Sequence, residues 1–199
     1  MTFALAAILG LVALAPLTLL VSLRLPGLAT AMTLSRWLLK IGFGLAAAAA
    51  LFIAMAQLGA VVTRNIFGIN FIWLQESAVY FFGLMVLLAP AAMIVANSHV
   101  RVDIFYTDWS ERRKRIIDLV GLHLFVLPVA LLIVSSGTPY ALKAWQVLEG
   151  SPEPSGLPAV FLLKTLVPTF GVLLALAVGV RSHDLLTGKG RSTAARETI

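Results

Sequence analysis

The stretch IGFGLAAAAALFIAMAQLGAVV, residues 41–62, contains no charged residue, and Gln57 is its most polar side chain. A transmembrane helix rises about 1.5 Å per residue and needs roughly 20 apolar residues to cross a hydrocarbon core of about 30 Å. This stretch is long enough. It also lacks the period-two alternation of a membrane β-barrel strand. It therefore predicts a membrane-spanning helix.

Four further stretches meet the same criteria, at residues 3–23, 77–96, 116–136 and 157–180. The composition agrees with them: 60% of the residues are hydrophobic, 12% are charged, and the mean hydropathy is +0.97. A soluble domain has about 45–50% apolar and about 25% charged residues. The sequence thus excludes a water-soluble globule and predicts an all-α integral membrane protein.

The connecting segments divide the chain into three predicted parts. Residues 1–30 are expected to form an additional N-terminal transmembrane helix and its linker, residues 31–185 a helical membrane domain, and residues 186–199 a basic tail. A signal peptide is the other interpretation of the first stretch. That interpretation is disfavoured because no Lys or Arg precedes Arg24 and the apolar run exceeds the usual 7–15 residues.

The basic residues are sorted by connecting segment. Twelve of the 15 Lys and Arg residues lie before the second stretch, between the third and fourth, or in the tail. Arg64, Lys143 and Lys164 remain for the opposite side. The positive-inside rule then places the C-terminus in the cytoplasm and, with five spans, the N-terminus in the periplasm. The net charge of +6 is a topology signal, so we expect anionic phospholipids as partners and no nucleic acid.

Two rows of small residues at four-residue spacing predict close helix packing, either within the chain or with another subunit. The second stretch contains Gly42, Ala46 and Ala50, continued by Ala54, and the fifth contains Gly171, Ala175 and Gly179.

Motifs for catalysis are missing from the sequence. The chain has no cysteine and no G-x-S-x-G, H-E-x-x-H, P-loop or G-x-G-x-x-G pattern. We therefore expect no enzymatic activity, no cofactor and no metal. Every acidic residue lies in a connecting segment or at the end of a stretch, which argues against solute transport by this chain alone.

The histidines leave haem binding open as an alternative to a protein without a cofactor. Two histidines on different helices can ligate a haem, as in the membrane anchors of respiratory complexes. His99 and His123 are the candidates, although their depths differ by roughly 10 Å at 1.5 Å per residue. The other interpretation of His123 is a hydrogen-bonded residue at a helix interface.

The two longest connections carry distinctive residues. Arg64 closes one helix and Glu76 opens the next, so both complement the helix dipole, and Trp73 fits the aromatic belt at the membrane surface. The segment NSHVRVD, residues 97–103, contains His99, Arg101 and Asp103 and precedes an aromatic run. This segment and residues 34–40 are expected to be short amphipathic segments lying in the membrane interface.

The pattern R-N-x-F-G-x-x-x-x-W-x-x-E at residues 64–76, followed by N-S-H-V-R-V-D at 97–103 and a basic cluster, resembles a known family. It is similar to the small permease subunit of tripartite ATP-independent periplasmic (TRAP) transporters, the DctQ type, over about residues 36–185. Trp145, Glu149 and Lys164 further resemble the branch associated with mannitol and chloroaromatic compounds.

The resemblance implies a four-helix core in the bacterial inner membrane, to which residues 3–23 add one helix. It implies two protein partners, a large permease subunit of the DctM type and a periplasmic substrate-binding protein. The small subunit would be a scaffold in ion-coupled uptake, with sodium as the family's usual ion, of an organic acid or related solute. Arg64, Trp73 and Glu76 would shape the periplasmic loop near the docked binding protein. His99, Arg101 and Asp103 would lock the cytoplasmic turn, and Trp145 and Glu149 would have structural or interaction roles.

Overall fold

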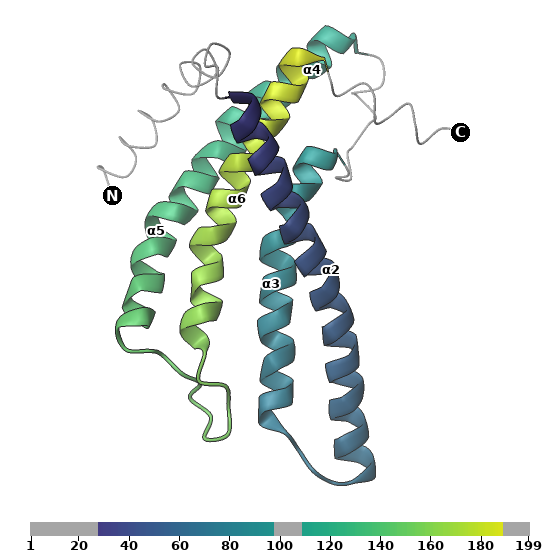
Figure 1. Ribbon diagram of the computed structural model, residues 1–199, viewed down its shortest axis with the longest axis vertical. Helices are drawn as coiled ribbons and strands as arrows, with labels where there is room; N and C mark the ends of the chain where they lie inside the picture. Colours follow the sequence, from purple (N-terminus) through teal and green to yellow (C-terminus); the bar gives the residue numbers. More distant parts are fainter. Residues whose placement is uncertain (1–27, 98–108, 189–199) are drawn as a thin grey trace.

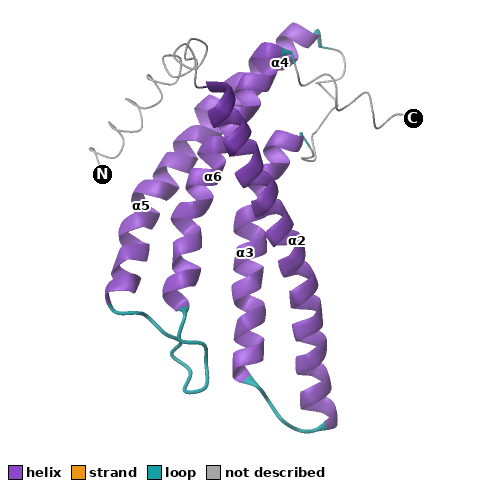
Figure 2. Ribbon diagram, viewed as in Figure 1, coloured by secondary structure: helices purple, strands orange, loops and turns teal. Residues whose placement is uncertain are grey.

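The computed structural model describes residues 28–97 and 109–188. Its helices are α2 (Leu28–Ile66), α3 (Ile72–Ala96), α4 (Glu111–Gly121), the π-helix η1 (Leu122–Val126), α5 (Leu127–Gln146) and α6 (Val160–Thr187). No strand occurs in these two ranges (Figure 2). The predicted helix at residues 3–23, the residues His99, Arg101 and Asp103, and most of the tail lie outside the described residues.

Four helices are long and apolar enough to cross a membrane, because α4, η1 and α5 run as one helix from Glu111 to Gln146. This confirms the prediction of an all-α membrane protein with a four-helix core. Helices α2 and α3 form one antiparallel hairpin, α5 and α6 form a second, and α3 packs against α6 between them (Figure 1). The three predicted parts of the chain stay a prediction.

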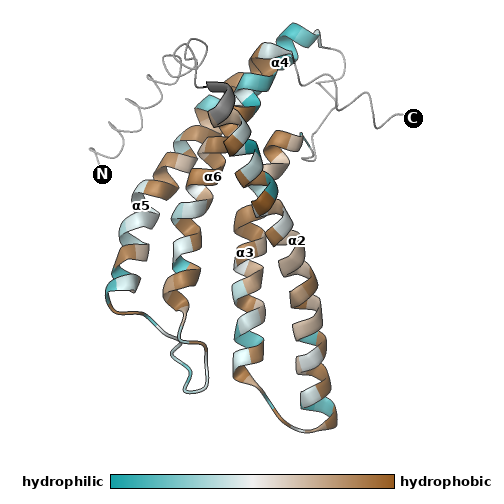
Figure 3. Ribbon diagram, in the orientation of Figure 1, coloured by the Kyte–Doolittle hydropathy of each residue, from teal (hydrophilic) through white to brown (hydrophobic). Residues whose placement is uncertain are grey.

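The two ends of the bundle differ in character. At one end, which we call the basic end, α2 and α4 begin and α3 and α6 finish. The other end, the loop end, holds the connections at residues 67–71 and 147–159. Apolar residues dominate the helices between the two ends, and α4 at the basic end is more hydrophilic (Figure 3). This distribution is the one that a bilayer between the two ends favours.

Helix α2 begins earlier than the sequence predicts. Residues 34–40, expected to form a separate segment on the membrane surface, are the early turns of α2. They are not a separate segment because residues 28–41 contain no proline and no glycine to end the helix, and their position in the membrane interface stays a prediction. In addition, Leu39 is only 3% exposed and belongs to the central core, so burial holds these turns in the bundle.

The packing face of α2 follows a different spacing from the predicted row. Gly42 and Ala46 are buried, and the buried face continues through Ala49 and Ala56, while Ala50 is exposed. The observed spacing alternates between three and four residues, as in left-handed helix packing at about +20°. A strict four-residue row rotates away from the partner because an α-helix has 3.6 residues per turn.

Gly171 sets the distance between α5 and α6. A Cβ at this position would lie 2.8 Å from the carbonyl oxygen of Ala130 and 2.8 Å from Cγ2 of Val134. Ala175 packs against the core, whereas a Cβ at Gly179 would meet nothing within 4 Å. Packing of Ala50 and Gly179 against a helix of another subunit therefore stays a prediction.

The central core lies where the helices meet and consists of Leu39, Ala91, Ala130, Leu174, Ala177 and Val180.

The π-helix η1 has a local cause. Pro128 has no N–H to donate to the carbonyl of Leu124, and its ring crowds that oxygen. The helix accommodates this with one wider turn, in which the N–H of Leu127 bonds to the carbonyl of Leu122, five residues earlier. The wider turn keeps α4 and α5 continuous across the proline.

Candidate functional site

Glu76 joins the two hairpins at the loop end. It lies in the first turns of α3, and its Oε2 accepts a 2.6 Å hydrogen bond from the backbone N–H of Leu157. Its Oε1 accepts a hydrogen bond from the Ser151 hydroxyl. One helical turn further, the Tyr80 hydroxyl lies 3.4 Å from the carbonyl oxygen of Leu157. We call Glu76, Ser151 and Leu157 the Glu76 clasp, because they fix the 147–159 loop to α3.

The loop can approach Glu76 only because residue 156 is glycine. A Cβ at Gly156 would lie 2.7 Å from Oε1 of Glu76 and 2.5 Å from Cβ of Ser151. Both distances are well below van der Waals contact. The Ser151 hydroxyl also accepts a 3.1 Å hydrogen bond from the backbone N–H of Glu153, and the N–H of Ser151 bonds to the carbonyl of Leu157 at 3.1 Å. The loop is therefore a hydrogen-bonded structure with its own internal contacts.

A second cluster joins the same loop to α5 and α6. Nζ of Lys164 lies 2.6 and 2.7 Å from the two carboxylate oxygens of Glu149 and 4.5 Å from the centre of the Tyr140 ring. Nε1 of Trp145 donates a 2.8 Å hydrogen bond to Oγ1 of Thr165. Trp145 and Glu149, two of the sequence-predicted residues, therefore lie together and brace the helix ends next to the Glu76 clasp.

Helix α5 ends in an unusual cap. The N–H of Leu148 bonds to the carbonyl of Trp145 at 3.2 Å, and the N–H of Glu149 bonds to that of Ala144 at 3.0 Å. This is a Schellman motif, which places Leu148 in the left-handed conformation with φ of 45°. Glycine is usual at this position because a Cβ costs about 1–2 kcal/mol there.

The α2–α3 connection presents the other predicted loop-end residues outward. Trp73 is 49% exposed, and its ring lies 6.0 Å from that of Phe71. Nε2 of Gln75 donates a 2.7 Å hydrogen bond to Oδ1 of Asn70. Arg64 is exposed in the last turn of α2. The structure does not pair Arg64 with Glu76, whose carboxylate bonds to the 147–159 loop instead.

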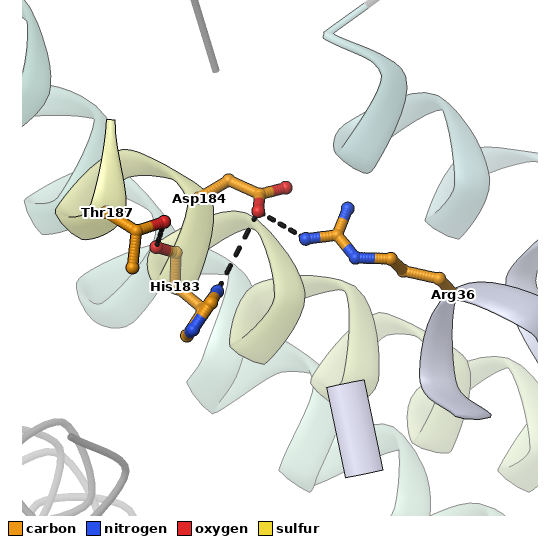
Figure 4. A network of polar contacts seen from close by, with 4 residues as sticks. All are labelled: Arg36, His183, Asp184 and Thr187. Atoms are coloured by element: carbon orange, nitrogen blue, oxygen red, sulfur yellow. Dashed lines mark hydrogen bonds and ion pairs between the residues drawn. The ribbon is translucent and has the colours of Figure 1, made fainter. Parts of the chain in front are cut away.

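The basic end contains a buried ionic contact between the first and last described helices. Arg36 of α2 forms an ion pair with Asp184 of α6, whose side chain is 9% exposed (Figure 4). Nδ1 of His183 lies 3.8 Å from Oδ1 of the same carboxylate, and the Thr187 hydroxyl bonds to the His183 carbonyl at 2.8 Å. A carboxylate this deeply buried requires a cationic partner.

Arg181 forms the second polar contact of the basic end. It is 9% exposed, donates a 2.7 Å hydrogen bond to Oδ1 of Asn97, and lies 3.8 Å from Oδ2 of Asp118. These three residues line an open cavity of 410 Å³ whose other walls are mainly aliphatic.

His123 lies in η1 and does not line this cavity. Its Nδ1 lies 2.9 Å from the carbonyl oxygen of Leu119 in the preceding turn. This hydrogen bond lies within its own helix, and the position of His123 at a helix interface stays a prediction.

Sequence reasoning missed the ionic contacts of the basic end. It interpreted Arg36 and Arg181 only as basic residues that orient the chain in the membrane, and Asp184 only as an acidic residue at the end of a spanning stretch. One signal for them was available in the spacing, because Arg181 and Asp184 continue the buried positions Leu174, Ala177 and Val178 of α6. Charged residues that continue a core-facing pattern must pair inside the bundle.

The described residues do not assemble a metal-binding cluster. Within residues 28–97 and 109–188, no group of three or more His, Asp and Glu side chains is placed to hold a metal ion. Their polar contacts hold helices and loops together. Two groups of polar contacts lie at each end of the bundle.

The comparisons with known proteins agree with this arrangement. A family model described as "Tripartite ATP-independent periplasmic transporters, DctQ component" matches residues 53–188, from within α2 to the end of α6. Comparisons with curated proteins and with solved structures give no match. Components of this family work with a large permease subunit of the DctM type and a periplasmic binding protein, in a transporter of the inner membrane. The chain belongs to the DctQ family, and is the small membrane subunit of a TRAP transporter.

Proposed function

We propose that the chain is a noncatalytic scaffold, which holds the large permease subunit during binding-protein-dependent, ion-coupled uptake of a small organic acid or related solute. One observation carries the proposal. Residues 41–63, 77–96, 124–142 and 165–180 of the four spanning helices contain no Asp, Glu, Lys, Arg or His. Transporters place ionisable groups and broken helices near the midplane to bind substrate and coupling ion. These helices offer packing surfaces instead.

The distribution of charge supports an orientation. The basic end carries Arg36, Lys40, the Arg112–Arg115 run and Arg181, whereas the loop end carries three basic residues. The positive-inside rule then puts the basic end and the C-terminus in the cytoplasm. The loop end faces the periplasm, and with a spanning first helix the N-terminus does too. Arg112 and Arg113 are exposed and would contact anionic phospholipid at about 1 kcal/mol per residue.

This orientation turns the loop end toward the periplasmic binding protein. Exposed Arg64 and Trp73 would contact the docked protein, while Glu76 would act indirectly by holding the 147–159 loop. Substituting Trp73 with Ala should then raise the concentration of binding protein needed for half-maximal uptake and leave the maximal rate unchanged. A fall in the maximal rate alone would contradict a docking role.

Reconstitution tests the scaffold proposal. Sealed vesicles would contain the small subunit alone, the large subunit alone, or both, and each set would receive substrate-loaded binding protein and an ion gradient. We expect uptake only from vesicles with both subunits, and none from the small subunit alone with any ion. Ion-driven solute flux through the small subunit alone would refute the scaffold role.

A further inference from the structure

A cavity at the basic end lies between α3 and α4. Both of these helices pack against α6, and all three contribute to the walls of the cavity together with η1. The cavity has a volume of 410 Å³, within the range of about 300–1,000 Å³ that is usual for small-molecule sites. The side chains that line it decide which kind of molecule it can hold.

The lining of the cavity changes from polar to aliphatic with depth. Asn97, Asp118 and Arg181 form its polar part at the basic end. Leu122 and Val126 follow Asp118 by four and eight residues on the same continuous helix, roughly 6 and 12 Å closer to the loop end at 1.5 Å per residue. A fitting molecule therefore has a polar end and an aliphatic part that extends toward the middle of the bilayer.

Positive charge dominates around the polar part of the cavity. Arg181 lies 3.8 Å from Oδ2 of Asp118, so these two charges balance each other. Helix α4, however, carries four basic residues against two acidic ones. Lys114 lies one turn before Asp118 on the same face of α4, and its side chain is 23% exposed, against 62% for its partner Glu111. The surroundings of the polar part are therefore positive and favour an anionic group.

Water and soluble anions are poor occupants of such a cavity. Aliphatic walls offer water few hydrogen-bond partners, and apolar cavities stay dry. A soluble anion would leave the aliphatic walls without contacts and would forgo their dispersion attraction. A phospholipid supplies both an anionic and an aliphatic part, and the leaflet at the basic end presents its headgroups at this level.

We infer that the cavity is a binding site for one anionic phospholipid, whose phosphate lies near Lys114 and Arg181 and whose acyl chain lies along Leu122 and Val126. This site differs from the general attraction of exposed arginines to the membrane surface, because it holds a single lipid molecule between helices. It depends on the lining of this chain alone and not on the scaffold role proposed above. The bound lipid fills the space between α3 and α4, and it stabilises the folded subunit by mass action.

Gly121 offers a variant that fills the aliphatic part of the cavity. It lines the cavity, and a Cβ at this position would meet nothing within 4 Å. Gly121→Leu should keep or raise the thermal midpoint of the full-length subunit in detergent, because leucine favours a helix more than glycine. Its affinity for dioleoylphosphatidylglycerol, measured by native mass spectrometry, should fall about tenfold or more. Gly44→Leu on α2 is the matched control, since its Cβ also meets nothing within 4 Å and it does not line the cavity.

A second variant tests the charge of the site. Lys114→Gln should lower the affinity for dioleoylphosphatidylglycerol about fivefold, the contribution of one basic residue at an anionic surface. Lys40→Gln makes the same change at an exposed position of α2 that does not line the cavity, and it should have a smaller effect. Glycerophosphoglycerol, which is the same headgroup without acyl chains, should not bind at the concentrations at which the lipid does.

Several results would overturn the lipid site. Equal lipid affinity of the wild type and Gly121→Leu would do so, as would equal losses in each variant and its matched control, because lipid would then bind the surface in general. A lower thermal midpoint of Gly121→Leu without lipid would show that the chain's own residues fill the cavity, and would also overturn the site. Binding of glycerophosphoglycerol as tight as that of the lipid would reduce it to an anion site. All these measurements use the small subunit alone, so they leave the scaffold role unaffected.

Discussion

Oε2 of Glu76 accepts a 2.6 Å hydrogen bond from the backbone N–H of Leu157, which follows it by 81 residues in the chain. The bond crosses from the α2–α3 hairpin to the α5–α6 hairpin. One carboxylate at the start of a helix thus determines where the neighbouring loop lies. A hydrogen bond to a charged acceptor contributes about 1.5–3 kcal/mol, so the clasp is a substantial tie between the hairpins.

Removal of the Glu76 carboxylate should release the loop. Glu76→Ala leaves the Leu157 N–H and the Ser151 hydroxyl without their acceptor, so we expect a lower unfolding temperature in detergent and faster proteolysis within residues 147–159. Glu76→Gln keeps one carbonyl acceptor and should show a smaller effect. Glu153→Gln, on the exposed part of the same loop, is the control. Wild-type proteolysis rates in Glu76→Ala would refute the clasp.

Gly156 should tolerate no side chain. Gly156→Ala places a Cβ 2.7 Å from the Glu76 carboxylate, so the loop must move away and the clasp must lengthen. We expect a destabilisation of about 1–3 kcal/mol, the usual cost of overpacking. Gly44→Ala is a suitable comparison because its Cβ would meet nothing within 4 Å. Equal thermal midpoints for the two variants would contradict the close approach.

Gly171 and Gly179 make a matched pair on one helix. Gly171→Ala brings a Cβ to 2.8 Å from the Ala130 carbonyl oxygen and should separate α5 from α6, whereas Gly179→Ala enters open space. In the isolated small subunit, Gly171→Ala should lower the thermal midpoint and Gly179→Ala should not. If Gly179 packs against another subunit, Gly179→Ala will instead reduce the amount of large subunit that co-purifies.

Removing Arg36 alone should destabilise the protein more than removing both Arg36 and Asp184. Arg36→Ala leaves the mostly buried Asp184 carboxylate without its cation, which we expect to destabilise the bundle by about 1–3 kcal/mol, less than a fully buried pair because Arg36 is partly exposed. The double variant Arg36→Leu with Asp184→Leu removes both charges and should recover most of the loss. Thermal unfolding of the wild type, Arg36→Ala and the double variant measures these differences in stability. A double variant no better than Arg36→Ala would show that pairing is not what the carboxylate requires.

His99, Arg101 and Asp103 remain a prediction from the sequence. If they lock the cytoplasmic turn, Arg101→Ala and Asp103→Ala should lower the yield of assembled complex and the uptake rate in parallel. Blue-native electrophoresis would measure the yield of assembled complex, and transport assays on the same membranes would measure the uptake rate. Normal assembly and uptake in both variants would exclude such a lock.

Several features were predictable because they depend on residues close together in the chain. Continuous apolar runs identified the four described spans, and the sorting of Lys and Arg distinguished the two ends. The end of α2 near Arg64 followed from helix-dipole preferences. The expectation that Glu76 opens the next helix was wrong, because α3 begins at Ile72 and has no acidic residue in its first turn. The start of α2 was not predictable in this way, because residues 34–40 are amphipathic and fit both a surface segment and a helix end. Burial of Leu39 in the core decided between them.

The sequence by itself determined that the chain belongs in a bilayer, which of the described segments are long and apolar enough to cross it, and which end is basic, because transfer free energies and helix propensities act residue by residue. Tertiary structure alone decided which small residues are buried, so that Ala49 and not Ala50 faces inward. It also decided that Glu76 meets Leu157 and that Arg36 meets Asp184. Those pairings depend on the crossing of helices that are far apart in the chain, and no local preference encodes that geometry.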